Sequence, residues 1–416
     1  MNKPEQVRAA RAPSRPSVGP GFAEFVVLMA ALMSLNAFAI DAMLPALPAL
    51  GDDLRVTEEN RRQLVVTFYT VGFGLTQMVW GPLSDRFGRR RVLVAGLLLY
   101  AVFALLAALA TSFAMLLIAR TLQGGAAAST RVLVTSIVRD RFEGATMAKV
   151  MSLTFMVFML MPVLAPSFGQ LVLLFAEWRA IFWALAIWGV GMLGWAWARL
   201  PETLDPANRR AISVAAVSGA TRETLTNRTS LGYTLAGTVL FGALMGYIAS
   251  IQQIVFDVFQ RPGALAVVFA GVAIPMAAAS FGNSRFVVRV GVRRMAHWAL
   301  VAVAAVSAIH LAWVLTLGES LWVFVALQGL TMGCFGLASS NMNALAMQPM
   351  GHIAGTATAV QGTVSTILAA IIGAAIGQSF DGTTVPLTAG FLAMSLVAVG
   401  LIRWTEGGRM FAGDVR

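Results

Sequence analysis

The stretch GPLSDRFGRRRV at residues 81–92 decides the fold of this chain. It lies between two long apolar runs and holds one carboxylate and four guanidinium groups, those of Asp85, Arg86, Arg89, Arg90 and Arg91. Gly81 and Gly88 permit close backbone approach and unusual turn dihedrals within it. Because charged side chains enter hydrocarbon only at a high free-energy cost, the stretch predicts a turn at the cytoplasmic surface of a membrane.

The composition of the 416 residues also indicates a membrane protein, since 58% are hydrophobic and only 12% are charged. A helix of about 20 apolar residues crosses about 30 Å of hydrocarbon. Twelve runs of this kind occur, at residues 22–45, 63–83, 91–110, 113–138, 146–174, 179–200, 230–252, 264–284, 294–316, 320–346, 353–378 and 385–404. We therefore expect an all-α membrane protein with twelve transmembrane helices.

Three short patterns recur in the same order in the two halves of the chain, which indicates an internal duplication. They are the spaced arginines and glycine of residues 86–91 and 289–294, LQG at 122–124 and 327–329, and GQ at 169–170 and 377–378. The second loop has Val288 where the first has Asp85, so its charge pattern is incomplete. The duplication predicts two pseudo-symmetric six-helix bundles.

The distribution of basic residues predicts the orientation of these bundles. Of the 30 Lys and Arg residues, 23 fall in the tails and in the alternate loops on the side of the N-terminus, which predicts that both termini are cytoplasmic. The net charge of +11 then faces anionic lipid, and no nucleic-acid partner is expected. The expected division is a disordered cytoplasmic tail at 1–21, an N-terminal bundle at 22–200, a cytoplasmic linker at 201–229, a C-terminal bundle at 230–404 and a cytoplasmic tail at 405–416.

One carboxylate stands apart from the other acidic residues. Of the 19 Asp and Glu residues, all except Asp41 fall in tails, loops or span ends. Asp41 lies about four residues inside the outer end of the first span, before Pro45 and Pro48, which lack amide donors and should bend the helix. An acid in an apolar setting is costly when ionised and much cheaper when protonated, so Asp41 is a candidate proton carrier. The alternative is an acid at the outer water boundary without a transport role.

The fourth span supplies a candidate partner for this acid. Arg120, Gln123 and Arg131 share one helix face at intervals of three and eleven residues. Each arginine would cost roughly 2.5–3.5 kcal/mol against lipid, so this face should line a wet cavity or meet polar groups. Arg120 lies at a depth similar to that of Asp41, and we expect the two to pair. Arg131 lies about 16 Å deeper and either meets an anionic or carbonyl-bearing substrate or extends its charge to the membrane surface.

The loop at 81–92 resembles the signature loop between the second and third spans of the major facilitator superfamily. The fifth span carries Pro162 and Pro166, each of which removes a helix hydrogen bond. Its stretch APSFGQ at 165–170 partly resembles the antiporter motif of exporters in that superfamily, with Gly169 retained and both outer glycines replaced. The prolines and Gly169 are therefore candidate elements of a conformational switch.

Across nearly the whole chain, the motifs resemble the bicyclomycin and chloramphenicol resistance group of drug:proton antiporters. They are IDAMLPALPAL at 40–50, the 81–92 loop, RTLQG at 120–124, RD at 139–140, the prolines of span 5, WRAIFW at 178–183, PET at 201–203 and AGTATAVQG at 354–362. The resemblance implies a twelve-span exporter of a bacterial inner membrane.

The same resemblance implies roles for individual residues. Asp41 and Arg120 would handle the proton. Asp85 would lie against the positive end of span 11, near residues 352–355, and Arg89 would pair with Asp140 in the outward-open state. The conformational switch would comprise Gly81, Asp85, Arg86, Gly88, Arg89, Arg90 and Asp140 together with Pro162, Pro166 and Gly169.

The sequence also offers candidate residues for a substrate cavity. The sequence contains 21 Met and 25 Phe residues, which suit an apolar cavity that adapts to ligands of different shape. The candidates are Tyr69, Gln123, Arg131, Phe155, Phe158, Tyr247, Gln252, Asn341, Asn343 and Gln361. The aromatic residues among them are alternatively packing residues, and the amides alternatively join helices.

These features predict a proton-coupled secondary transporter that exports small amphipathic organic compounds by alternating access and acts as a monomer. The alternative within the same fold is transport of one specific metabolite, including an anionic one. A non-transporting membrane sensor is a third and less favoured hypothesis. The sequence has no G-x-x-x-x-G-K-[ST] phosphate loop, and its three histidines are scattered, so we expect neither an enzyme nor a cofactor or metal requirement.

Overall fold

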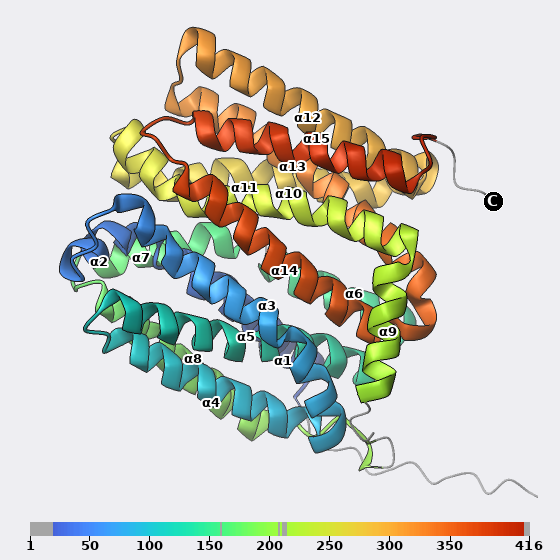
Figure 1. Cartoon of the computed structure of the whole chain (residues 1–416). Helices are drawn as coiled ribbons and strands as arrows, with labels where there is room; N and C mark the ends of the chain where they lie inside the picture. Colours follow the sequence, from blue (N-terminus) through green and yellow to red (C-terminus); the bar gives the residue numbers. More distant parts are fainter. Residues whose placement is uncertain (1–19, 159, 207–208, 210–213, 412–416) are drawn as a thin grey trace, which may run out of the picture.

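The computed structural model describes residues 20–158, 160–206, 209 and 214–411, and the regular secondary structure within these ranges is helical (Figure 1). The expected tail at 1–21 therefore lies outside the described residues except for residues 20 and 21, and the expected tail at 405–416 is described as far as residue 411. The N-terminal half contains α1 (Phe22–Asp41), η1 (Leu44–Ala46), α2 (Leu47–Asp53), η2 (Glu59–Gln63), α3 (Leu64–Phe87), α4 (Arg89–Ala108), α5 (Phe113–Arg141), α6 (Gly144–Phe158), α7 (Met161–Leu173) and α8 (Arg179–Arg199).

A short helix, α9 (Val214–Thr226), precedes the C-terminal half, so the stretch expected to be only a linker is partly helical. The C-terminal half contains α10 (Arg228–Gln253), η4 (Ile254–Val258), η5 (Pro262–Ala264), α11 (Leu265–Val290), α12 (Val292–Leu317), α13 (Leu321–Met347), η6 (Gln348–Ile353), α14 (Ala354–Gln378) and α15 (Val385–Thr405).

Each of the twelve apolar runs forms helix. By length and composition, nine stretches of the described residues can cross a membrane, one of them joining α13 and α14 through η6. The runs outside these nine are α5, which carries several arginines, and the pair α6 and α7, which are short. Large apolar side chains such as those of Ile118, Ile187 and Leu317 face outward with 62–70% exposure, which suits contact with lipid.

Two of the twelve spans are interrupted where the sequence places proline. The first span ends its α-helix at Asp41 and continues as the short helices η1 and α2, which begin next to Pro45 and Pro48. Asp41 is thus the last residue of α1, and not a residue four positions inside a continuous helix. The fifth span breaks between α6 and α7, just before Pro162.

The backbone at the two repeated loops supports the internal duplication. Gly88 joins α3 to α4 with φ 100° and ψ 148°, and Gly291 joins α11 to α12 with φ 91° and ψ 142°. Side chains other than hydrogen rarely adopt such positive φ values, so both turns need glycine. The two halves therefore use the same sharp connection at equivalent points.

The two halves pack side by side, with α3 and α14 crossing between them (Figure 1). A second contact joins α7 to α11. Within the halves, α5 packs on α3 and α4, and α10 packs on α14 and α15. The α9 end of the molecule, defined here by α9 and the end of α15, lies opposite the α2 end, which holds α2 and η2 (Figure 1).

Candidate functional site

A cavity of about 290 Å³ lies between the two halves. Helices α1, α3 and α5 line one wall, and α10, α11, α13 and α14 line the other. Its lining residues are Met33, Asn36, Ala37, Ile40, Asp41, Tyr69, Thr70, Phe73, Arg131, Phe241, Leu244, Met245, Tyr247, Ile248, Phe269, Val272, Ala273, Met276, Met332 and Thr366. An apolar cavity with few polar groups, placed where two bundles meet, suits a small organic ligand.

Asp41 contributes the carboxylate of this cavity. The residue is 4% exposed, and its Oδ1 atom accepts no hydrogen bond from another described residue. A buried carboxylate without a hydrogen-bond donor or counter-charge carries a large desolvation cost, which protonation removes. The cavity lining therefore includes a carboxylate whose enclosure is costly while it is ionised.

The chain next to Asp41 is packed unusually tightly. A Cβ atom at Gly169 would lie 1.9 Å from the carbonyl oxygen of Ala42, so only glycine lets α7 approach this point. Pro166, one turn earlier in α7, is buried. The part of the sequence that resembles an antiporter motif thus lies directly against the break after the acid. The side chain of Pro162 is outside the described part of the structure.

The expected pair between Asp41 and Arg120 is absent among the described residues. Arg120 is fully buried and donates hydrogen bonds to the Ala39 carbonyl at 3.0 Å, the Val65 carbonyl at 3.4 Å and Gln123 Oε1 at 2.8 Å. Its guanidinium also stacks over the Tyr69 ring, 4.3 Å from the centroid. Arg120 is held by carbonyl oxygens and an aromatic face, so it needs no carboxylate.

Tyr69 connects the arginine to the cavity, because its ring contacts Arg120 and also lines the cavity wall. The hydroxyls of Tyr69 and Tyr247 and the side-chain carbonyl oxygen of Asn36 are buried without a hydrogen-bond partner. All three residues line the cavity beside Asp41 or Arg131. Unsatisfied buried polar atoms are costly, so a ligand or water that bonds them would be bound favourably.

The remaining candidate cavity residues lie elsewhere. Gln123 packs behind the cavity wall against Arg120, and Asn343 is exposed. Gln252 is buried but is not among the lining residues. Phe155 and Phe158 belong to α6, and their side chains lie outside the described part of the structure.

Two of the candidate amides join helices. Asn341 of α13 donates to Asn283 Oδ1 of α11 at 2.9 Å. Gln361 of α14 donates to Ser230 Oγ of α10 at 2.9 Å and to the Ala346 carbonyl at 3.2 Å. These amide side chains form hydrogen bonds between helices of the C-terminal half. This is the alternative role, joining helices, that the sequence left open for them.

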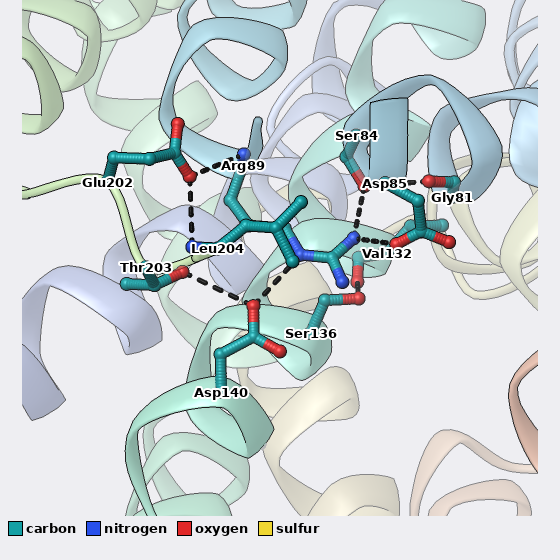
Figure 2. Close-up of polar contacts among 10 residues, drawn as sticks. All are labelled: Gly81, Ser84, Asp85, Arg89, Val132, Ser136, Asp140, Glu202, Thr203 and Leu204. Atoms are coloured by element: carbon teal, nitrogen blue, oxygen red, sulfur yellow. Dashed lines mark hydrogen bonds and ion pairs between the residues drawn. The ribbon is translucent and has the colours of Figure 1, made fainter. Parts of the chain in front are cut away.

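Arg89 is the centre of a polar cluster at the α9 end (Figure 2). Its guanidinium lies 2.5 Å from Asp85 Oδ1 and 2.9 Å from Asp140 Oδ2, and it donates to Ser84 Oγ at 2.6 Å. The Arg89 side chain is 5% exposed, so these ion pairs form in a largely dehydrated setting. The cluster ties the ends of α3 and α5 to the start of α4.

Glu202, for which no role was predicted, completes this cluster. Its Oε1 atom accepts hydrogen bonds from the backbone N–H of Arg89 at 2.8 Å and of Leu204 at 3.2 Å (Figure 2). The next residue, Thr203, donates to Asp140 Oδ2 at 3.3 Å. Glu202 caps the first turn of α4, where a carboxylate is favourable. The available signal was the PET stretch after α8, whose acid recurs as Glu406 after α15.

The other residues of the expected switch surround this cluster. Gly81 lies in α3 one turn before Asp85, and the guanidinium of the exposed Arg86 lies over the Phe87 ring at 5.2 Å. Gly88 supplies the turn described above. Arg90 bonds the Trp197 carbonyl and stacks over the Trp197 ring at 5.0 Å.

Asp85 does not contact the start of α14 in the described structure. It pairs with Arg89, while His352 pairs with Glu223 of α9 at 2.8 Å. Within the described ranges, the hydrogen bonds between the two halves lie in the middle of the molecule and at the α2 end. Among the described residues, the contact of Asp85 with residues 352–355 is therefore not formed, because the Asp85 carboxylate is paired with Arg89 instead.

Neutral amides join the halves at the α2 end, and we name them the amide latch: Asn60, Gln63, Gln253 and Gln378. Asn60 Nδ2 donates to the carbonyls of Gln378 at 3.1 Å and Phe380 at 2.9 Å. Gln253 Nε2 donates to Asn60 Oδ1 at 3.0 Å, and Gln63 donates to Gln253. Gln378 Nε2 donates to the Asn60 carbonyl at 2.6 Å. The latch closes this end of the molecule.

We expect Asn60→Ala to open the α2 end more often. The substitution removes three hydrogen bonds across the halves, and it should lower the ratio of closed to open molecules by about tenfold. Spin labels introduced by Asp52→Cys and Thr383→Cys in a Cys334→Ser background would report longer distances in electron-resonance measurements. Ser379→Ala is the control, because that hydroxyl bonds only the Ala375 carbonyl within α14. Unchanged distance distributions would contradict the latch.

Comparison with known proteins gives a consistent result. A family model described as Major Facilitator Superfamily matches residues 29–374. The bicyclomycin resistance protein homolog of Haemophilus influenzae is 29% identical over 365 residues, which cover 87% of this chain and 91% of the relative. The multidrug resistance protein MdtL of Escherichia coli is 28% identical over 405 residues, which cover 93% and 97%.

A solved structure shares the fold. The human organic anion transporter MFSD10 matches with a TM-score of 0.64 and 18% identity, over 93% of this chain and 99% of that one. At this identity the match concerns the fold alone.

Proposed function

The chain belongs to the major facilitator superfamily of membrane transporters, and from the acid in its central cavity we propose that it is a proton-coupled exporter of small amphipathic organic compounds. The observation that carries the proposal is Asp41, a buried carboxylate with an unsatisfied oxygen, in the cavity between two bundles. A proton-coupled transporter needs a titratable group in its cavity, because the protonation state of that group must differ between the two directions of the cycle.

In the proposed cycle, Asp41 takes up a proton when the cavity faces the outside. The neutral acid lowers the cost of enclosing the cavity, and the halves rock so that the cavity faces the cytoplasm. Release of the proton there leaves an ionised Asp41 carboxylate, which bound cargo must cover before the halves return. The Arg89 cluster stabilises one arrangement of the α9 end, and the amide latch stabilises closure of the α2 end.

The proposed orientation places the α9 end in the cytoplasm, because the loops and tails on that side hold 23 of the 30 basic residues. The amide latch is then the outer gate. Under this orientation, the hydrogen bonds of the latch support an inward-facing cavity. We propose that one chain completes the cycle as a monomer.

The relatives support export of drug-like compounds, since they are named for bicyclomycin resistance and multidrug resistance. The lining of the cavity supports the proposal that the range of cargo is broad. Four of its lining residues are methionine and three are phenylalanine, namely Met33, Met245, Met276, Met332, Phe73, Phe241 and Phe269. Methionine is flexible and polarizable, so such walls adapt to ligands of different shape.

The proton gradient supplies enough free energy for this work. A potential of about 150 mV and a pH difference of about 0.5 give roughly 4 kcal/mol for one inbound proton. That free energy supports a concentration ratio of about a thousandfold for a neutral cargo.

The test uses the purified protein in liposomes that are acidic inside and contain a pH-sensitive dye. In the inside-out orientation, addition of an amphipathic phenicol or cationic dye should release protons from the lumen. Liposomes without protein and liposomes exposed to a hydrophilic sugar are the controls. Cargo flux that does not change when the pH gradient is collapsed would refute proton coupling.

A further inference from the structure

The two walls of the central cavity differ in polarity. The N-terminal half contributes Asn36, Asp41, Tyr69, Thr70 and Arg131, which carry most of the polar atoms of the lining. The C-terminal half contributes mainly apolar side chains and only two hydroxyl groups, those of Tyr247 and Thr366. A bound molecule would therefore turn its polar groups toward the N-terminal half and its apolar body toward the C-terminal half.

Arg131 is the cation of this lining, and its guanidinium makes no hydrogen bond or ion pair with another described residue. The contrast with Arg120 on the same helix is informative, because Arg120 is fully buried and its donors are occupied by three oxygen atoms. Arg131 is instead an exposed side chain that opens onto the cavity. A planar guanidinium with free donors is suited to bind a carboxylate, sulfonate or phosphate through two hydrogen bonds.

The position of Arg131 separates it from the proton site. Arg131 follows Arg120 by eleven residues, which is about 16 Å along α5 toward the α9 end. Arg120 itself bonds the Ala39 carbonyl, two residues before Asp41. The acid and the free cation therefore lie at different depths, and an anion at Arg131 is not in direct repulsion with Asp41.

We propose that Arg131 binds the anionic group of an amphipathic cargo, whose apolar body lies against the methionine and phenylalanine side chains of the C-terminal half. The inference rests on the proposed function only in treating this cavity as the cargo site. The chemical class is an aromatic or alkyl carboxylate, sulfonate or phosphate ester small enough for a cavity of about 290 Å³.

The proposal has a consequence for energy coupling. Outward movement of one monoanion and inward movement of one proton together carry two positive charges inward. The membrane potential therefore contributes twice, at about 2.3 kcal/mol per 100 mV for each charge. Exchange of one neutral cargo molecule for one proton carries one positive charge inward. The current that accompanies transport therefore reports the charge of the cargo.

The binding test compares two fluorescent probes with the same ring system. Anilinonaphthalene sulfonate carries a permanent anion, and phenylnaphthylamine lacks the sulfonate and is neutral. Binding is measured to the full chain in phosphatidylcholine nanodiscs, which contain no anionic headgroup, with empty nanodiscs subtracted. We expect Arg131→Gln to weaken binding of the sulfonate by about tenfold or more and to leave the neutral probe within about twofold.

Three further measurements make the result decisive. Arg131→Lys keeps the charge and should restore part of the sulfonate affinity, while Arg222→Gln on the exposed face of α9 removes the same charge elsewhere and should change neither probe. Phosphatidylglycerol is then added to the nanodiscs. If this lipid lowers sulfonate binding to the parent protein but not to the Arg131→Gln variant, a lipid headgroup occupies Arg131. Preference of the site for the lipid over the sulfonate would overturn the cargo assignment.

The outcomes separate this inference from the proposed function. Equal weakening of both probes, or unchanged sulfonate binding in Arg131→Gln, would overturn the anion site even if proton release by neutral cargo is observed. Selective loss of the sulfonate without any proton release would support the anion site and refute proton coupling.

Discussion

Asp41→Asn is expected to abolish accumulation of cargo against a gradient while binding persists. Asparagine has the size of the protonated acid but cannot take up or release a proton, so the protein should retain only exchange down a concentration gradient. The loss corresponds to the whole ratio of about a thousandfold that one proton can support. Cargo-induced proton release from liposomes measures the coupling, and fluorescence titration measures the binding.

Glu58→Gln is the matched control for this experiment. Glu58 is an exposed acid at the α2 end, so its neutralisation should leave proton release unchanged. Proton release at the parent rate in Asp41→Asn would refute the role of this acid. Loss of cargo binding together with transport would instead assign Asp41 to recognition of the cargo.

Arg89→Gln is expected to cause the largest loss of stability. It leaves Asp85 and Asp140 without their shared cation in a cluster where the arginine side chain is only 5% exposed. Breaking a buried ion pair by removing one partner costs about 3–5 kcal/mol, and we expect the lower end because the Asp85 side chain is 44% exposed. Unfolding followed by thiol accessibility of Cys334 in detergent would measure the loss.

The neighbouring Arg91→Gln provides the control, since Arg91 is exposed in the same helix turn. Arg89→Lys should recover part of the stability, because the ammonium keeps the charge but cannot bond both carboxylates as the guanidinium does. If Arg89→Gln and Arg91→Gln unfold alike, the cluster does not stabilise this end of the protein.

The helical spans could be predicted from the sequence because hydropathy is a local property. Each of the twelve apolar runs forms helix, and the glycines of the repeated loops have matching backbone angles at Gly88 and Gly291. The unusual position of Asp41 could also be predicted, since an acid in an apolar run stands out without knowledge of its neighbours. Its location in the cavity is consistent with the high free energy of placing a charged side chain against lipid.

The partners of individual side chains could not be predicted as well, because they depend on rotation about helix axes and on contacts between distant helices. Arg120 was expected to meet Asp41, yet it bonds the backbone at Ala39, two residues earlier. Gln252 was expected to face the cavity, whereas the adjacent Gln253 joins the latch. One residue along a helix rotates a side chain by about 100°, which decides such cases. Glu202 was missed because its partner, the backbone of Arg89, is 113 residues away.

The absence of charge from the four latch side chains has a physiological consequence under the proposed orientation. Amides do not titrate and are weakly affected by ionic strength, unlike gates built from ion pairs. Acidification or high salinity of the surrounding medium would then leave the hydrogen bonds of the latch amides unaltered, and the proposed response of the cavity to external acidity would reside in Asp41. Under this proposal, the response to acidity resides in Asp41 and the outer closure in the amide latch. A cell in changing media could then keep the outer closure intact while the rate of export varies with the external proton concentration.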